Sequence, residues 1–124
     1  TGTAQYEVNK LSAELGNADV ELVRKELGTE FDMIVHEPDG ILEIGQAGHS
    51  KASGIERLCA SLGIAKEDTY AFGDSANDVE MLEFVAHGIA MGNGTDVAKN
   101  AAEFVTTDIH KDGIWNGLKH YGLI

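Results

Sequence analysis

Two short apolar runs in the second half of the chain each lead into a glycine and then into a helical pattern. Residues 69–72 (TYAF) run into Gly73, and residues 87–91 (HGIAM) run into Gly92. Strands that are apolar throughout are typical of a parallel sheet, because helices cover both of its faces. The alternation of such strands with helices therefore predicts an α/β fold with a doubly wound parallel sheet.

Helical patterns flank these runs, and their ends carry capping residues. Ser50 precedes apolar positions at helical spacing and Gly63 supplies a stop, while Thr95 is expected to cap a later helix. The expected core helices cover about 51–62, 76–85, 96–101 and 111–121, and a third core strand is expected over 103–106.

The first part of the chain follows a different pattern, which predicts a small β-α-β-β unit. A loosely alternating strand within 6–13 is followed by a helix that Asn17 is expected to cap and Gly28 to end. Residues 30–45 then predict a hairpin around a Pro-Asp-Gly turn. A glycine-containing linker at 45–50 is expected to separate this unit from the parallel sheet.

Composition restricts the class of partner. The 124 residues carry a formal net charge of −12, which disfavours nucleic acid and anionic membranes. No apolar run approaches the roughly 20 residues of a membrane helix, and the single cysteine, Cys59, suits a reducing compartment such as the cytoplasm. Glycines are expected at the sheet edge where strands turn into loops, namely Gly73, Gly88, Gly92 and Gly94.

The most informative stretch is GDSANDVEML at 73–82, where a buried strand is expected to meet a helix. Asp74 falls at the carboxyl end of the strand, and Asn77 and Asp78 fall in the first helical turn. Two carboxylates and an amide form a hard-oxygen site suited to Mg²⁺, and the adjacent helix N-terminus favours an anion. A structural alternative remains open, in which Asp74 or Asn77 caps the helix and Asp78 complements its dipole.

Two further signals carry alternatives of their own. Lys51 begins a helix, where a cation is electrostatically unfavourable, so it either pairs with an acid or a phosphate or is simply exposed. Residues 92–95 (GNGT) resemble a phosphate-cradling turn but are too short for a P-loop. A tight connection with Thr95 as the helix cap is the favoured interpretation.

Taken in order, these pieces resemble the haloacid dehalogenase-like superfamily, and within it the Cof-type sugar-phosphatase branch that carries an α/β cap. Ser50-Lys51 is similar to the lysine motif of the family, and 73–82 is similar to its acidic motif. Residues 87–106 and 110–124 are similar to the usual ending of that branch. The resemblance covers essentially the whole chain.

The resemblance implies a fold and a set of roles. Residues 1–45 would be the C-terminal part of the cap, and residues 46–124 the C-terminal half of the Rossmann-like core. The site residues would be Asp74, which binds Mg²⁺; Asp78, which supports the metal and orients the lysine; Lys51 and Asn77, which contact the transferred phosphate; and Ser75, which contacts the metal through water.

One part of the family pattern is missing. Phosphatases of this family attack phosphorus with an aspartate of a D-x-D-G-T motif, and the 124 residues do not contain that motif. The nearest string, at 38–41 (PDGI), lacks the first aspartate and the threonine. Because the chain also begins at Thr1 without methionine, it is expected to be the C-terminal part of a longer phosphatase.

The leading hypothesis is thus a Mg²⁺-dependent phosphatase acting on a phosphorylated small molecule, with this chain inactive alone. Absent first core strands would leave a sheet edge exposed, which favours self-association. The alternatives are a non-catalytic module that binds a phosphorylated ligand or a partner protein, and one half of a split enzyme. The phosphorylation domain of a transport ATPase has a similar acidic motif but is disfavoured, because no membrane segment is present.

Overall fold

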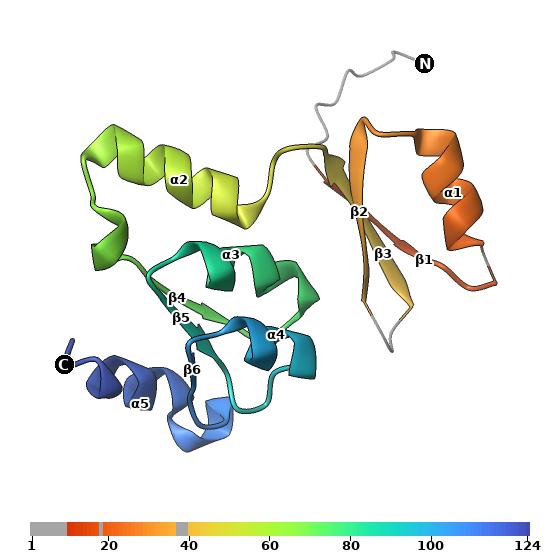
Figure 1. Cartoon of the computed structure of the whole chain (residues 1–124). Coiled ribbons are helices and arrows are strands. Elements are labelled where there is room, and N and C mark those ends of the chain that lie inside the picture. The colour runs from red at the N-terminus through yellow and green to blue at the C-terminus, as the bar shows by residue number, and fades with distance from the viewer. Residues whose placement is uncertain (1–9, 18, 37–39) are drawn as a thin grey trace, which may run out of the picture. The chain divides into compact units, whose positions relative to one another are not determined.

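The computed structural model of the chain describes residues 10–17, 19–36 and 40–124 (Figure 1). Contacts divide these residues into two compact units, with the division between His49 and Ser50. The start of the predicted first strand, 6–9, and most of the predicted turn, 37–39, lie outside the described residues.

The first unit is a three-stranded antiparallel sheet with one helix. Its strand order is β1-β3-β2, and β3 pairs with both neighbours. Leu42 of β3, opposite Ala13 and Val35, is only 3% exposed and anchors the small apolar core. The elements are β1 (Lys10–Glu14), α1 (Val20–Leu27), β2 (Phe31–His36) and β3 (Ile41–Gln46).

Two boundaries in this unit differ from the sequence prediction. The cap of α1 is Asp19 rather than Asn17, because the helix begins at Val20 and a cap must directly precede the first helical residue. The predicted linker is also shorter at its start, because Gly45 is still paired with strands on both sides. The helix stop at Gly28 is confirmed, with φ of 66°.

The second unit contains the predicted parallel sheet, with strand order β4-β5-β6. Its α-helices and strands are α2 (Lys51–Leu62), β4 (Tyr70–Gly73), α3 (Val79–Phe84), β5 (His87–Ala90), α4 (Asp96–Ala101), β6 (Phe104–Val105) and α5 (Gly113–His120). Three 3₁₀ turns cover Lys66–Asp68, Ala76–Asp78 and Ile109–Lys111. The predicted α/β class with helices flanking a parallel sheet is confirmed.

Helices α3 and α5 cover opposite faces of this sheet. A Cβ on Gly73 would lie 2.6 Å from Cβ of Asp78 and 3.1 Å from Leu82 of α3, whereas the ring of Phe72 lies against Gly117 of α5. Since successive strand residues point to opposite faces, these contacts place one helix on each side. The central strand β5 is accordingly the most buried, with Ile89 at 0% exposure.

Two predictions at the sheet edge need correction. Gly88 lies near the start of β5, at the end of the sheet opposite Gly73. A glycine is needed there because a Cβ would lie 2.3 Å from the Leu82 carbonyl oxygen. The helix expected over 76–85 begins as a 3₁₀ turn, and α3 starts only at Val79. None of the helices in the described ranges has the length and apolarity needed to cross a bilayer.

Candidate active site at the carboxyl edge of the parallel sheet

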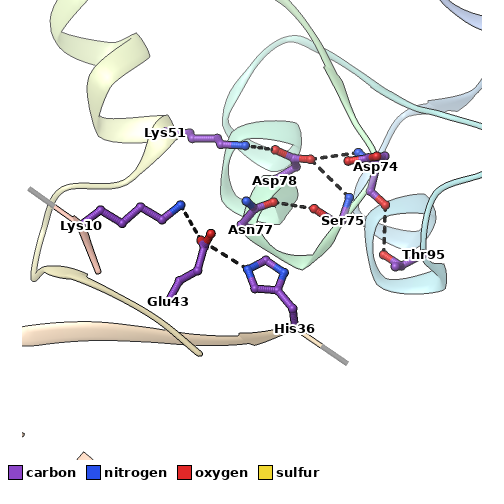
Figure 2. Close-up of polar contacts among 9 residues, drawn as sticks. All are labelled: Lys10, His36, Glu43, Lys51, Asp74, Ser75, Asn77, Asp78 and Thr95. Atoms are coloured by element: carbon purple, nitrogen blue, oxygen red, sulfur yellow. Dashed lines mark hydrogen bonds and ion pairs between the residues drawn. The ribbon is translucent and has the colours of Figure 1, made fainter. Parts of the chain in front are cut away.

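The buried carboxylate of Asp78 is the centre of the polar network at the end of β4. Its side chain is 6% exposed, and its Oδ1 accepts a hydrogen bond from Nζ of Lys51 (Figure 2). Its Oδ2 accepts from the backbone N–H groups of Asp74, at 2.9 Å, and Ser75, at 3.3 Å. The carboxylate therefore joins the start of α2 to the loop that leaves the sheet.

A glycine makes this arrangement sterically feasible. Gly73 is the last residue of β4, and the Cβ of Asp78 occupies the space beside it. The 3₁₀ turn over Ala76–Asp78 brings the carboxylate back over the loop, so that it meets the N–H groups at the end of the strand. The sequence pattern G-D-x-x-x-D thus encodes a closed turn around one acid.

Charge on Asp78 is stabilised despite its burial. Burial opposes ionisation, but the hydrogen bond from Lys51 and those from the N–H groups of Asp74 and Ser75 outweigh it and hold the pKa of Asp78 below its ordinary value. Lys51 itself is half exposed, at 49% of its side chain. The lysine therefore presents charge to solvent while one side of its ammonium group is held by Asp78.

Asp74 differs from Asp78 in having an exposed side chain, and no hydrogen bond to its carboxylate occurs within the described residues. Its backbone is held instead. The Asp74 carbonyl accepts from the N–H of Thr95 at 2.8 Å and from the Thr95 hydroxyl at 3.3 Å. The loop after β5 therefore fixes the residue after β4, a contact that sequence reasoning missed because the two residues are 21 positions apart in different loops. Thr95 also caps α4.

Ser75 and Asn77 form a second, smaller contact within the same turn. The hydroxyl of Ser75 lies 2.6 Å from Oδ1 of Asn77 (Figure 2). Both side chains are half-buried. The structure thus brings all five sequence-predicted site residues, Lys51, Asp74, Ser75, Asn77 and Asp78, into one neighbourhood of the second unit.

The side chains of this neighbourhood suit Mg²⁺, which needs few protein ligands, better than a metal that needs three or more protein ligands. The described part of the chain holds no group of three or more His, Cys, Asp or Glu side chains arranged around a common metal position. Asp78 is committed to Lys51 and backbone N–H groups, which leaves Asp74 as the free carboxylate. Mg²⁺ commonly takes one or two carboxylates and completes its shell with water and substrate phosphate.

Fold and site together define a Rossmann-like α/β protein with its polar groups at the carboxyl ends of parallel strands, where such sheets bind ligands. The sequence profile of the haloacid dehalogenase-like hydrolases matches residues 3–118. The chain belongs to this family, and the predicted resemblance to its Cof-type phosphatases is confirmed.

Individual relatives support the same placement. The chain is 54% identical over 78 residues to an uncharacterized protein in the pdhA 5′ region of Geobacillus stearothermophilus, covering 63% of this chain and 82% of that protein. It is 42% identical over 84 residues to 5-amino-6-(5-phospho-D-ribitylamino)uracil phosphatase YitU of Bacillus subtilis, covering 68% of this chain and 31% of that enzyme.

A solved structure extends the likeness to nearly the whole chain. The sugar phosphatase BT4131, of subclass IIB of the same superfamily, is 31% identical with a TM-score of 0.85. The match covers 96% of this chain and 45% of BT4131. The chain therefore spans less than half the length of YitU and of BT4131.

Proposed function

We propose that the chain supplies the lysine and the acidic residues of a Mg²⁺-dependent phosphomonoester hydrolase acting on a small, sugar-phosphate-like substrate. The observation that carries this proposal is the buried carboxylate of Asp78, which ties Lys51 to the Asp74 loop at the carboxyl edge of β4. Membership of the hydrolase family and the phosphatase activity named for YitU support it.

Each residue has a role that follows from its position. Lys51, half exposed and held by Asp78, would bind the transferred phosphate and neutralise its negative charge. This neutralisation would contribute most in the transition state. Asn77 would donate a hydrogen bond to the same group. Asp78 stays ionised and keeps Lys51 in place, so that it acts on catalysis through the lysine.

Asp74 is the residue proposed to hold Mg²⁺, with Asp78 behind it and Ser75 contacting the metal through water. Its carboxylate is exposed, while its backbone is fixed by Asp78 on one side and Thr95 on the other. When bound, the metal would polarise the phosphate and offset its negative charge. A carboxylate on a held backbone suits this purpose, because only its side chain has to be ordered when the metal binds.

The attacking aspartate is proposed to come from residues other than these 124. A D-x-D-G-T motif is absent from the sequence, so no candidate nucleophile of the family type accompanies Lys51 and Asp74. The chain alone is therefore expected to be inactive. The same absence favours a second candidate function, a non-catalytic module that binds a phosphorylated ligand or a partner, or one half of a split enzyme.

We further propose that residues 1–45 are the C-terminal part of an α/β cap and that 46–124 are the C-terminal half of the core. The antiparallel sheet of the first unit and the parallel sheet of the second support this division. In this arrangement the cap portion would help to select the substrate and the core portion would handle its phosphate.

The test of the function has two arms. Isothermal titration with Mg²⁺ should show binding that Asp74→Asn abolishes and that Asp68→Asn, a change at an exposed acid outside the network, leaves intact. Incubation with Mg²⁺ and p-nitrophenyl phosphate should give no turnover. Robust turnover abolished by Asp74→Asn would contradict the missing nucleophile, and unaltered metal binding in that variant would contradict the proposed site.

The proposed macromolecular partner is a second copy of this chain. In the described residues β4 pairs only with β5, which leaves its other edge unpaired. Helix α2, which packs against α3, also exposes Leu58 at 58% and Leu62 at 63% of their surface. Light scattering at rising concentration should detect dimers or larger species that Leu58→Glu reduces, and a strictly monomeric chain would contradict this proposal.

A further inference from the structure

The contact between Ser75 and Asn77 joins two oxygens, of which only the hydroxyl can donate. The two oxygens lie 2.6 Å apart. An amide oxygen carries no hydrogen and only accepts, and a distance of 2.6 Å is ordinary for an O–H···O bond. The Ser75 hydroxyl therefore donates to the amide oxygen of Asn77, and the amide nitrogen points away from Ser75, as Figure 2 shows.

This orientation decides what Asn77 can bind. Its nitrogen carries two donors, and neither meets a protein acceptor within the described part of the chain. A rotated amide would present its oxygen instead, which repels an anion. The free N–H groups make the half-buried side chain a donor for a negatively charged ligand.

We propose that Ser75 is a positioning residue, which holds the amide of Asn77 with its two N–H donors turned toward the bound phosphoryl group. The inference rests on the proposed function for the identity of that ligand. It gives Ser75 an effect through Asn77 that is separate from any contact between Ser75 and the metal.

The local backbone allows a clean test. Ser75 is extended, with φ of −139° and ψ of 176°, a conformation that alanine and threonine both adopt without strain. Its backbone N–H donates to the Asp78 carboxylate, and this bond survives a change of the Ser75 side chain because it does not use that side chain. Ser75→Ala therefore removes the hydroxyl alone, and Ser75→Thr is the matched control because it keeps one.

The first measurement uses no ligand. The order parameter of the Asn77 side-chain amide, measured by ¹⁵N relaxation on the full chain, should be high in the wild type and fall in Ser75→Ala. Ser75→Thr should restore it. An amide that stays equally ordered in Ser75→Ala would overturn the inference.

The second measurement is binding of inorganic phosphate in the presence of Mg²⁺, by isothermal titration. Ser75→Ala should weaken binding about two- to tenfold, the range of one lost hydrogen bond, and Ser75→Thr should bind as the wild type does. In the Asn77→Ala background, Ser75→Ala should weaken binding by less than it does in the wild-type background, because only the contact of Ser75 with the metal through water is left to lose. An equal loss in that background would overturn the positioning role.

The two measurements separate the inference from the proposed function. A wild-type chain that binds no phosphate would contradict the proposed function, and the order of the Asn77 amide would then decide the positioning role by itself. Phosphate binding that is insensitive to Ser75→Ala, with the amide still ordered, would contradict the inference and leave the proposed function standing.

Discussion

Lys51, at the start of α2, donates a hydrogen bond to the buried carboxylate of Asp78, 27 residues further along the chain. The acid is 6% exposed and the lysine 49% exposed, so the pair is half in solvent and half in protein. The pairing accounts for a cation at a helix N-terminus, where the helix dipole disfavours positive charge. Asp78 offsets that cost by direct charge pairing.

Removing the charge of Asp78 should destabilise the second unit. In Asp78→Asn the ammonium of Lys51 loses its charged acceptor, and the backbone N–H groups of Asp74 and Ser75 share a weaker acceptor. The free energy of unfolding should fall by about 1–3 kcal/mol, measured by urea unfolding with the fluorescence of the single tryptophan, Trp115. Asp68→Asn should change it by less than about 0.5 kcal/mol, and equal losses in the two variants would contradict this role of Asp78.

The same carboxylate predicts a pH dependence. Because the pKa of Asp78 is lowered in the folded state, its contribution to stability is complete above the ordinary value of about 4 and disappears as the pH falls through the folded value. The stability gap between wild type and Asp78→Asn should be largest at neutral pH and close in acid. A gap that stays constant down to about pH 3 would show that the ion pair contributes nothing to it.

Two glycine-to-alanine changes should have opposite effects. A Cβ at position 73 would lie 2.6 Å from Cβ of Asp78, so Gly73→Ala must displace the carboxylate and should cost about 1–3 kcal/mol. Gly54, inside α2, has nothing within 4 Å of an added Cβ. Gly54→Ala should instead stabilise the helix by about 0.5–1 kcal/mol.

Thermal unfolding of the two glycine variants checks these signs in one experiment. Gly73→Ala should also weaken binding of Mg²⁺, because the loop that carries Asp74 rests on Asp78. A Gly73→Ala chain that melts at or above the wild-type temperature would show that the close contact is absent in solution.

At the end of the parallel strands opposite Asp74 and Asp78, Tyr121 should lose its proton only at unusually high pH. Burial and the hydrogen bond that its hydroxyl donates to Glu103, at 3.0 Å, raise the pKa of Tyr121 to about 12. Its contribution to stability is therefore complete below the ordinary tyrosine value of about 10 and lost as the pH rises through about 12.

Ultraviolet absorbance during alkaline titration measures this pKa directly. Tyr121→Phe should remove the part of the absorbance change that occurs at the highest pH, and so assign it to Tyr121. Glu103→Gln should lower the pKa of Tyr121, since a neutral acceptor replaces the carboxylate that opposes ionisation. A titration curve unchanged by Glu103→Gln would mean that burial alone holds the proton.

Sequence reasoning succeeded where the governing interactions are local. The caps at Ser50 and Thr95 and the stop at Gly63 were predicted correctly because each acts within one helical turn. Asn17 failed for a local reason as well, since Asp19 is an equally good cap two residues closer to the helix. Such near ties are decided by the residue at which the helix begins, which here is Val20.

Long-range contacts explain the remainder. The sequence alone left Lys51 between a pairing role and simple exposure, because its partner lies in another element. Gly88 was assigned to the edge that carries Asp74. It lies at the opposite end of the sheet, where the Leu82 carbonyl oxygen leaves no room for a side chain. The link from Thr95 to the Asp74 carbonyl was missed for the same reason.

That link has a consequence for protein engineering. Thr95 donates a hydrogen bond to the carbonyl of Asp74, and a Cβ on Gly94 would come within 2.9 Å of the same oxygen. The loops after β4 and β5 therefore hold each other in place and depend on each other's sequence. Transplanting the acidic loop of another family member into this chain without its own version of residues 92–95 would leave the new aspartate unsupported. The two segments should be exchanged as a pair.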